Sequence, residues 1–592
     1  MSTIRPPVRG DTGGDASGDP GGDASGDACS AAAASPTFPE QFNLADYFLF
    51  EREREGRGDR VAIRFGSRGW TYAEVASRSR GLARRLIALG IAPEQRIYIV
   101  LPDIPPFAWA IFGTLAAGAV VAMGNPLAPA EDVLYVLDYV KAAVLITTPE
   151  VAAQLAPRLP QLPHLRAMLL APNAATGDDP EASVALVGQL AALASPALHV
   201  ASLDRAIAEG DTADHRLPVL RRDDPAIWLF TSGSTGRPKA AMHSHRDFAF
   251  NTEVYAKRTV GYVETDIAIS VPRLFFGYAT GTNLWFPFAV GATVGLFSER
   301  PTAESVADAI ARYRPTIVTN VPTMLGKLLD LDDERRAAGQ PGLDLSSVRF
   351  HLSAGEALPE PLLRRFVQRF GGAVYDGIGS AEMFHIYCSN RPGDVVPGSL
   401  GRVVDGYVLK ILAEDADGAG APSLPPNEIG VLWVKGDSVA HGYFQDRDKS
   451  WKTFHGHWCR TGDLFQIDER GYLWFSGRAD DLFKVGGIFV APREVEDCLL
   501  AHVAVSNAAV IPGDDAGLIK PKAIVVLRPE ARDRDRRALA DELKAHVQAR
   551  LSKHKYPRWV VFLDDLPKND RGKVDKRLLM DRERRGELIE TG

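Results

Sequence analysis

Residues Ile227 to Lys239, IWLFTSGSTGRPK, join a short apolar run to a loop of hydroxyls and glycines that ends in two basic residues. The consecutive apolar residues up to Phe230 predict a buried strand. The loop from Thr231 to Gly236 can offer backbone N–H groups and hydroxyls to phosphate oxygens, with Arg237 and Lys239 as countercharges. The stretch therefore predicts a phosphate site directly after a strand.

This loop has two other interpretations. Loops rich in Ser, Gly and Thr are common surface connections, so the loop alone is weak evidence for a site. The loop also lacks the Gly-Lys-Ser/Thr ending of a Walker P-loop, so the pattern does not indicate an ordinary NTPase.

Strand and helix patterns alternate on both sides of this stretch. The predicted strands are mostly followed by helical patterns such as Ala303 to Tyr313, and Ser244 to Asp247 has the form of a helix N-terminal capping box. This alternation predicts βαβ units and therefore an α/β fold. The predicted strands are Arg96 to Leu101, Ala143 to Thr147, Ala226 to Phe230, Ile267 to Val271, Thr293 to Leu296 and Ile317 to Asn320.

The uncharged stretch Ile104 to Ala130 is long enough to cross a bilayer. Pro105 and Pro106 open it, and Gly124 to Pro126 ends its apolar part. These breaks divide it into an Ala/Gly-rich helix and a short strand. We therefore expect a buried helix and strand of the α/β domain here, and no membrane partner.

Three further motifs follow the phosphate loop. They are YDGIGSAE (Tyr375 to Glu382), YLWFSGRADD (Tyr472 to Asp481) after Arg460 to Asp463, and PKNDRGK (Pro567 to Lys573). In this order and spacing, the four motifs resemble those of the acyl-adenylate-forming superfamily, which includes acyl-CoA synthetases, luciferases and adenylation domains of peptide synthetases. The resemblance covers the chain from about residue 40 to its end.

Longer stretches indicate a subfamily. Gly377 to Gly401, Asp480 to Glu496 and Gly517 to Leu527 resemble benzoate-type aryl-CoA ligases. The resemblance implies a large N-terminal domain of βαβ units with a β-rich subdomain, over residues 38–479. A small mobile α+β domain would follow over residues 480–592, with Asp480 as the hinge between them. A plain tight turn is the alternative interpretation of this junction.

The same resemblance implies ligation of a small aromatic acid, of the benzoate or 2-aminobenzoate class, to coenzyme A. ATP would first convert the acid to an aroyl-AMP with release of pyrophosphate, and the thiol of coenzyme A would then displace AMP. The crowded negative charge of the first step calls for Mg²⁺, lysine and preorganised donors. Glu382 would bind Mg²⁺, and Lys573 and Lys239 are the other candidate catalytic residues.

The resemblance also assigns binding residues. Asp463 would accept from the ribose hydroxyls with Arg478 nearby, Tyr375 would stack near adenine, and Lys484 would approach coenzyme A beside two glycines that permit close backbone contact. The full set of candidates for nucleotide and coenzyme A is Thr231, Ser232, Gly233, Ser234, Thr235, Gly355, Glu356, Tyr375, Asp376, Gly377, Ser380, Asp463, Arg478, Lys484, Gly486 and Gly487. Lys568 and Lys576 are expected to be solvent-exposed companions of Lys573.

An aromatic acid needs an apolar slot with a few placed polar groups. Two segments rich in aromatic residues supply such groups, and we expect Tyr278 and His385 to face the ring and its ortho substituent. The candidate substrate residues are Phe276, Tyr278, Gly281, Ile378, Gly379, Phe384 and His385. Plain core packing is the alternative interpretation of these aromatic residues.

Two positions depart from the usual pattern of the superfamily. Ala381 stands where Thr or Ser usually contacts the α-phosphate, which leaves Ser380 as the nearest hydroxyl. Phe489 stands where many members carry Arg, although benzoate-type ligases commonly have an aromatic residue there. Ala381 leaves open a non-catalytic nucleotide-binding homologue. A stand-alone enzyme that loads an aryl acid onto a carrier protein is a separate alternative, against which the glycine loop and the benzoate-like C-terminal domain argue.

The composition agrees with a large enzyme. The chain has 592 residues, 45% of them hydrophobic and 24% charged, enough for more than one domain. Its net charge of −7 gives no reason to expect a nucleic-acid partner. Its widely spaced cysteines include no metal-binding or CxxC pair, so a reduced, cytoplasmic setting is expected. Homodimerisation is the expectation from the family.

The N-terminal residues carry a repeat instead of a core. GGDASGDP (Gly13 to Pro20) is followed by GGDASGDA (Gly21 to Ala28). Such a sequence buries too little apolar surface to offset the entropy of ordering. We therefore predict that residues 1–37 form a disordered tail.

Overall fold

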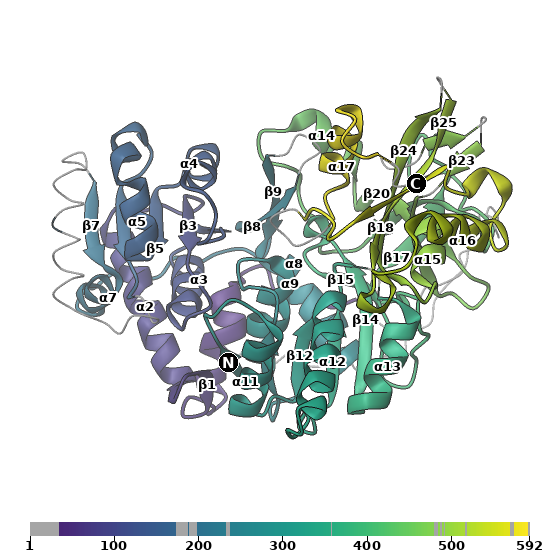
Figure 1. Cartoon of the computed structure of the whole chain (residues 1–592). Coiled ribbons are helices and arrows are strands. Elements are labelled where there is room, and N and C mark those ends of the chain that lie inside the picture. Colours follow the sequence, from purple (N-terminus) through teal and green to yellow (C-terminus); the bar gives the residue numbers. More distant parts are fainter. Residues whose placement is uncertain are drawn as a thin grey trace, which may run out of the picture.

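The computed structural model confirms the predicted α/β fold, with a β-rich subdomain and a smaller C-terminal α+β domain (Figure 1). The predicted N-terminal tail lies outside the described residues up to position 34. The structure describes residues 35–172, 188, 198–232, 237–356, 358–478, 483–485, 488–490, 492–515, 518–568 and 574–589.

The first large sheet carries the strand that leads into the predicted phosphate loop. All its neighbouring strands are parallel except the last pair, and the predictions near residues 96, 143 and 226 are confirmed. The order is β7 (His199–Ser202), β6 (Ala167–Leu170), β5 (Val144–Thr147), β3 (Arg96–Val100), β4 (Val120–Met123), β8 (Pro225–Ser232) and β9 (Pro238–Ser244). The pair β8 and β9 therefore forms a hairpin at one edge of a parallel sheet.

The second large sheet has a parallel centre and antiparallel edges, and the three remaining predicted strands lie in it as β10, β11 and β12. The order is β16 (Arg402–Val403), β15 (Ile386–Ser389), β14 (Ala373–Gly379), β13 (Phe350–Ser353), β12 (Ile317–Asn320), β10 (Ile267–Ser270), β11 (Thr293–Leu296), β1 (Val61–Phe65) and β2 (Arg68–Thr71).

Helices cover both faces of the two sheets, because alternate strand residues face opposite sides. In β3, Ile97 packs between the two sheets, whereas Tyr98 packs under outer helices. The inner layer holds α2 (Tyr72–Ala88), α3 (Pro106–Ala116), α7 (Leu203–Asp211), α8 (His245–Asn251), η3 (Thr252–Val260), η4 (Gly281–Trp285) and α10 (Phe286–Val290). The outer helices are α4 (Ala130–Tyr139), α5 (Pro149–Leu155) and η2 (Ala156–Gln161) on the first sheet, and α11 (Ala303–Tyr313), α12 (Pro322–Ala337) and α13 (Glu360–Phe370) on the second.

The uncharged stretch near residue 104 forms the buried helix α3 and strand β4, as predicted. Every residue of α3 is buried, which explains its apolar character without a bilayer. In the part of the chain that the structure describes, no helix is both long and apolar enough to cross a membrane.

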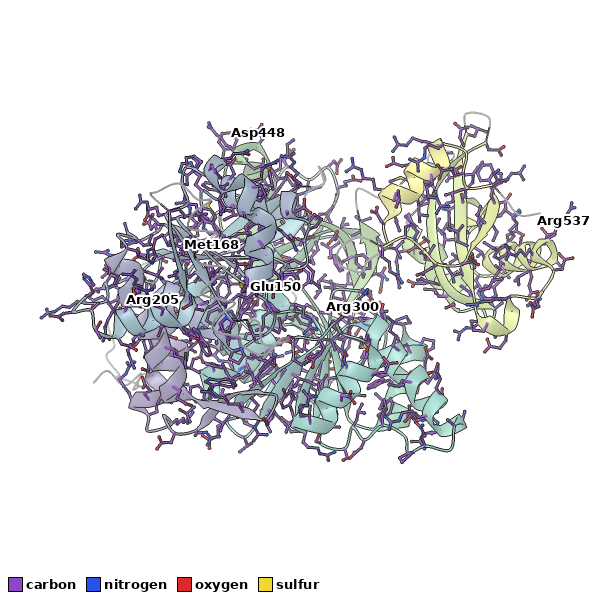
Figure 2. The ribbon with its side chains drawn as sticks, turned by 60° about the vertical axis from the view of Figure 1, so that its left-hand side comes forward. Glu150, Met168, Arg205, Arg300, Asp448 and Arg537 are labelled. Atoms are coloured by element: carbon purple, nitrogen blue, oxygen red, sulfur yellow. The ribbon has the colours of Figure 1, made fainter. Side chains whose placement is uncertain are left out.

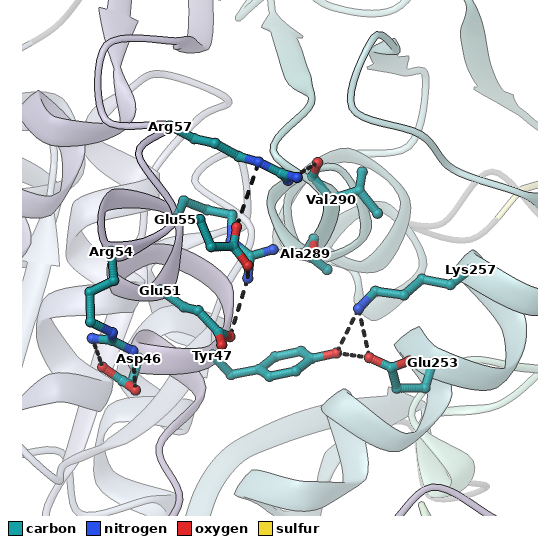
Figure 3. Close-up of polar contacts among 11 residues, drawn as sticks. Asp46, Tyr47, Glu51, Arg54, Glu55, Arg57, Glu253, Lys257, Ala289 and Val290 are labelled. Carbon is teal, nitrogen blue, oxygen red and sulfur yellow. Dashed lines mark hydrogen bonds and ion pairs between the residues drawn. The ribbon is translucent and has the colours of Figure 1, made fainter. Parts of the chain in front are cut away.

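The segment before β1 is held against the inner helices (Figure 3). It contains the π-helical turn η1 (Asp46–Phe50) and α1 (Glu51–Arg54). The hydroxyl of Tyr47 in η1 donates to Glu253 of η3, and Glu253 also pairs with Lys257 at 2.6 Å. Burial, together with the charge of Glu253, raises the pKa of Tyr47, so its hydroxyl stays a donor. These contacts fix the beginning of the large domain.

A separate antiparallel sheet forms the β-rich subdomain. It consists of β17 (Val408–Leu412), β18 (Gly430–Lys435), β19 (Phe454–His455), β20 (Trp458–Ile467) and β21 (Leu473–Arg478). The Gly/Pro-rich residues 416–426 connect β17 to β18, as predicted. The strand β21 runs into the predicted junction, whose Asp480 lies outside the described residues.

The C-terminal domain packs helices on both faces of one sheet. Figure 2 shows it as a lobe set apart from the large domain, with Arg537 of α16 at its outer end. The sheet order is β24 (Val505–Asp515), β25 (Leu518–Leu527) and β26 (Trp559–Leu563), and a short hairpin of β22 (Phe483–Val485) and β23 (Ile488–Val490) precedes it. Its helices are α15 (Pro492–Leu500), η7 (Pro529–Ala531), α16 (Arg536–Gln548), η8 (Lys553–Lys555) and α17 (Lys576–Arg584).

Candidate active site

The predicted phosphate loop connects β8 to β9. Thr231 pairs with Lys239 and Ser232 with Pro238, so the hydrogen-bonded ladder continues up to the loop. The loop begins at the carboxyl end of β8, the edge of a parallel sheet where ligands commonly bind. The predicted contacts Gly233, Ser234 and Thr235 lie outside the described residues. The predicted capping box is confirmed, since Ser244 and Asp247 are hydrogen-bonded at the start of α8.

Lys239 forms an ion pair with Asp446 that the local sequence does not predict. Its ammonium lies 2.8 Å from a carboxylate oxygen of Asp446, and its side chain is only 15% exposed. Asp446 also caps α14 (Arg447–Thr453), where it accepts the backbone N–H of Lys449. Partial burial acts to raise the pKa of Asp446, but the hydrogen bonds from Lys239 and from the Lys449 N–H, together with the charges of these two lysines, lower it overall. Lys239 therefore ties the hairpin to residues 440–446, and its contact with phosphate stays a prediction.

Glu382 lies in the short 3₁₀ turn η5 (Ala381–Met383), directly after the end of β14. Its carboxylate accepts a hydrogen bond from the Tyr443 hydroxyl at 2.7 Å, and its main-chain oxygen accepts one from Ala440 at 2.8 Å. The side chain of His243, in β9, contacts the Ala381 carbonyl at 2.7 Å. Glu382 is thus held through its carboxylate by Tyr443 and through the main chain of residues 381 and 382.

The donor set around Glu382 fits a magnesium ion that comes with a nucleotide. Mg²⁺ in phosphate-transfer sites is bound through one or two carboxylates, phosphate oxygens and water. In the described ranges, no group of three or more His, Cys, Asp or Glu side chains could hold a metal by itself. A single carboxylate such as Glu382 can therefore complete a metal site only when phosphate oxygens share the ion.

The register of the β-rich subdomain brings together the two residues predicted for the ribose. Asp463 in β20 is the direct partner of Arg478 in β21. The backbone N–H of Asp463 donates to the Thr461 hydroxyl at 3.2 Å, which fixes the turn before it. The sequence placed these residues near one another, and antiparallel pairing makes them neighbours across two strands.

The residues predicted for adenine also lie on neighbouring strands. Asp376 in β14 pairs with Ser353 in β13, and Gly355 and Glu356 follow the end of β13. Gly355 has φ of +89°, a left-handed conformation that glycine adopts without strain. The carboxylate of Glu356 accepts a hydrogen bond from the Thr323 hydroxyl at 2.8 Å. Tyr375 is buried, and Gly377 continues β14.

Asp376 has an unusual titration. Burial raises the pKa of its carboxyl from the ordinary 3.8 to about 8, although the neighbouring Ser353 hydroxyl and backbone N–H groups act in the opposite direction. A raised pKa means that the unfolded chain loses this proton at lower pH than the folded protein. We therefore expect the free energy of unfolding to fall as pH rises from about 4 to about 8, relative to Asp376→Asn.

Urea denaturation at pH 5 and pH 8 measures this difference. The gain in stability from Asp376→Asn should be larger at pH 8 than at pH 5. Asp344→Asn is a suitable control, because exposed Asp344 has a pKa lowered to about 2, chiefly by hydrogen bonds from Ser346, and stays ionised over this range. Equal gains from Asp376→Asn at the two pH values would contradict the expectation.

The two polar groups predicted for the aromatic ring are in contact. The His385 ring lies 5.3 Å from the Tyr278 ring between centroids, and its Nε2 lies 3.0 Å from the Tyr278 carbonyl oxygen. Because a carbonyl only accepts, Nε2 carries the hydrogen. Burial lowers the pKa of His385 to about 3, so the ring is neutral and Nδ1 holds a lone pair.

Two buried polar atoms of this cluster make no hydrogen bond within the described part of the chain. The Tyr278 hydroxyl oxygen and His385 Nδ1 are enclosed and have no hydrogen-bond partner in the part of the chain described. Buried polar atoms usually have a hydrogen-bond partner, so these two atoms are the candidates in this cluster for a contact with a bound acid. Gly281 permits the arrangement, since a Cβ there would lie 2.4 Å from the His385 ring.

The other predicted ring residues lie on the same stretches of chain as this pair. Phe276 precedes α9 (Gly277–Thr280), and Ile378 and Gly379 end β14. Phe384 has a positive φ of 66°, an uncommon conformation for a bulky residue, and stacks on Phe248. The nearby Ser380 hydroxyl is also buried and without a partner among the described residues. Its role in place of a hydroxyl at position 381 stays a prediction.

Several predicted residues of the C-terminal part cannot be placed. Lys573, Asp480, Gly486 and Gly487 lie outside the described residues, and only the backbone of Lys484 is described. On either side of the residues near Lys573 that the structure does not describe, Asp575 N–H donates to the Pro567 carbonyl at 2.8 Å. The strands β22 and β23 flank the two glycines.

One prediction for this segment holds only in part. The Lys576 side chain is 23% exposed, and its ammonium pairs at 2.8 Å with the Glu496 carboxylate. Glu496 lies on α15, far away in sequence, so the pairing could not be read from the local motif. Lys568 is exposed, as expected, and pairs with Asp565.

Sequence reasoning missed three residues of the site: His243, Tyr443 and Asp446. Each acts through a partner that lies far away along the chain. The local sequences around these residues are the pair of histidines on either side of Ser244 and the dipeptide Gly442-Tyr443. Neither pattern predicts a contact with Glu382.

Comparison with known proteins agrees with this geometry. A benzoate–CoA ligase of Thauera aromatica is 38% identical over 540 residues, 91% of this chain and 95% of its own. The crystal structure of the anthranilate CoA ligase AuaEII in complex with anthranoyl-AMP superposes with a TM-score of 0.81 at 31% identity, covering 93% of this chain and 99% of that one. A benzoate CoA ligase from Burkholderia xenovorans LB400 follows with a TM-score of 0.73 at 35% identity, over 91% and 99% of the two chains.

Two family models divide the chain between them. The model of the AMP-binding enzyme matches residues 50–444, and that of the AMP-binding enzyme C-terminal domain matches residues 494–573. Both matches include candidate site residues, and the first alone covers more than half of the chain. The chain therefore belongs to the AMP-binding enzyme family.

Proposed function

We propose that the protein is an AMP-forming acid–thiol ligase that joins a small aromatic carboxylic acid to coenzyme A through an aroyl-AMP. One observation carries this proposal. Glu382, the candidate carboxylate for nucleotide-bound metal, and His385, in the buried cluster with unpaired polar atoms, are three residues apart on one stretch. An acid bound at His385 would therefore lie close to the phosphates of ATP.

The reaction needs two displacements. In the first, a carboxylate oxygen of the acid attacks the α-phosphorus of ATP, and the bond to pyrophosphate breaks. In the second, the thiol sulfur of coenzyme A attacks the acyl carbon of the aroyl-AMP, AMP leaves, and the thiol proton passes to solvent. Stabilising the charge of the first displacement is the task of Lys573 and of the hairpin that Lys239 anchors. Mg²⁺, when bound at Glu382 and the phosphates, would neutralise phosphate charge.

Different residues of the C-terminal domain are proposed to act in the two steps. In this proposal Asp480 is the pivot between the domain that ends near residue 479 and the small domain that follows. Lys573 would face the site during adenylation, and Lys484 with its neighbouring glycines would face it during thiolysis. One site could then perform both displacements in turn.

The ring site favours a compact aromatic acid. The neutral His385 ring offers an acceptor at Nδ1, and the Tyr278 hydroxyl can donate or accept. One polar ring substituent could pair with these atoms, whereas the aromatic surroundings would bury the remainder of the ring. Benzoate and 2-aminobenzoate are the substrates proposed on this basis.

Three further attributes are part of the proposal and await tests of their own. Magnesium is the proposed metal, a homodimer is the proposed assembly, and the cytoplasm is the proposed compartment. The buried thiols of Cys388, Cys459 and Cys498 agree with a reducing compartment but do not require one.

The test is product analysis by mass spectrometry. The protein is incubated with ATP, Mg²⁺ and a panel of benzoate, 2-aminobenzoate, hydroxybenzoates, cinnamate and medium-chain fatty acids, with and without coenzyme A. We expect an aroyl-CoA from a small aromatic acid and an aroyl-AMP when coenzyme A is omitted. An adenylate that is not passed to coenzyme A would favour carrier-protein loading, and absence of any adenylate would favour a non-catalytic homologue.

A further inference from the structure

Residues 440–446 pair alongside the strand β9. Ala241 bridges to Tyr443, and Phe444 N–H donates to the Ala240 carbonyl at 2.9 Å. Met242 exchanges two further hydrogen bonds with residues 441 and 442, of 2.8 and 3.0 Å. Because β9 is the edge strand of its sheet, this segment covers its outer edge and is fixed in register with the phosphate hairpin.

The same segment reaches Glu382. The hydroxyl of Tyr443 donates to the Glu382 carboxylate at 2.7 Å, and Ala440 N–H donates to the Glu382 carbonyl at 2.8 Å. Because an ionised carboxylate only accepts hydrogen bonds, the Tyr443 hydroxyl is the donor in this contact. At the other end of the segment, Asp446 receives the ammonium of Lys239. Residues 440–446 thus connect Glu382 with the base of the phosphate loop.

A second contact from β9 limits the backbone before Glu382. His243 is buried, and its ring contacts the Ala381 carbonyl at 2.7 Å and the Asp247 carboxylate at 2.9 Å. The orientation of the imidazole is therefore set by α8. The side chain of Glu382 is fixed by Tyr443, which pairs with β9, and the main chain before it is fixed by His243 of β9.

We propose that Tyr443 is a positioning residue that orients the Glu382 carboxylate toward metal-bound nucleotide. The inference rests on the proposed function, because it assumes that Glu382 meets the metal. Tyr443 donates to one oxygen of the carboxylate. This hydrogen bond fixes the rotation of the carboxylate and therefore the direction in which the second oxygen points. A preorientated carboxylate loses less rotational freedom when a metal binds, and outer-sphere partners of this kind typically change metal affinity by about 10-fold or more.

The structure provides a matched pair of variants. Tyr443→Phe removes only the hydroxyl that touches Glu382. Tyr139→Phe removes a hydroxyl that contacts the same segment, through the Phe444 carbonyl at 2.5 Å, and the same strand, through Ala240 N–H at 3.5 Å. Both tyrosines therefore support the contact between β9 and residues 440–446, but only one reaches the carboxylate.

The experiment measures binding of Mn²⁺, as a probe for Mg²⁺, to the full chain with a non-hydrolysable ATP analogue, by electron paramagnetic resonance of free Mn²⁺. We expect Tyr443→Phe to weaken Mn²⁺ binding about 10-fold. Its affinity for the analogue without metal should stay within about twofold of wild type, and Tyr139→Phe should match wild type in both assays. Raising Mg²⁺ should restore most of the adenylation rate of Tyr443→Phe.

The proposal is overturned if Tyr443→Phe binds Mn²⁺ as tightly as wild type, or if Tyr139→Phe loses as much affinity. A double-mutant cycle adds an independent criterion, because Tyr443→Phe should cause no further loss in a Glu382→Gln background. If wild-type protein binds no metal–nucleotide at all, the proposed function itself fails, which separates the two outcomes.

Discussion

Replacing Lys573 by Ala is expected to lower the rate of adenylate formation by about 10²–10³-fold, while thiolysis of supplied aroyl-AMP continues at a near wild-type rate. The ammonium is proposed to balance charge between the acid and the α-phosphate only in the first step. Removing it should therefore raise the barrier of that step alone. Pyrophosphate exchange measures the first half-reaction, and aroyl-CoA formation from synthetic aroyl-AMP measures the second.

Lys568→Ala is the control for this prediction. Lys568 belongs to the same motif, but its side chain is 42% exposed and pairs with Asp565 at 3.3 Å. Its loss should leave both half-reactions unchanged. Equal loss of both half-reactions in Lys573→Ala would instead refute a role confined to adenylation.

The second large effect is expected from Asp480→Pro, which should preserve adenylation and reduce thioester formation by about 100-fold. Proline fixes φ near −65°, and a misplaced proline costs about 3 kcal/mol, which corresponds to about 100-fold in rate. The proposed pivot must change φ and ψ between adenylation and thiolysis. With proline at position 480, the protein should therefore adopt only the conformation for adenylation. Mass spectrometry of aroyl-AMP and aroyl-CoA distinguishes the steps.

Asp480→Ala separates the backbone from the side chain. Alanine removes the carboxylate but leaves φ able to change, so this variant should retain thioester formation. Unchanged turnover in Asp480→Pro would place the pivot elsewhere. Similar losses in both variants would point to the carboxylate instead of the backbone.

Local patterns predicted the framework of the large domain. The run before Phe230 forms β8, the alternation near residues 267–320 forms β10 to β12, and Ser244 starts a helix with Asp247. These features depend on neighbours in sequence, because strand burial, turn chemistry and capping act over a few residues. The stretch near residue 104 was interpreted correctly for the same reason, through its prolines and glycines.

Contacts between distant segments were not predictable in this way. The bond from Tyr443 to Glu382 joins residues 61 positions apart, and that from His243 to Ala381 joins residues 138 apart. The ion pair of Lys576 depends on Glu496, which lies on another element. No local pattern carries such information, since many folds could place these side chains elsewhere.

The family resemblance, the order of the motifs and the type of residue at each candidate position could all be read from the sequence. So could the prediction that Tyr278 and His385 belong to one site, because an aromatic acid needs an apolar slot with a few polar groups. How those residues are held became clear from the tertiary structure alone. It buried the His385 ring against the Tyr278 carbonyl, which selects one tautomer, and it aligned residues 440–446 with β9 so that Tyr443 meets Glu382. Residue identity is local, whereas burial and hydrogen-bond geometry depend on strands and helices that meet only after the chain has folded.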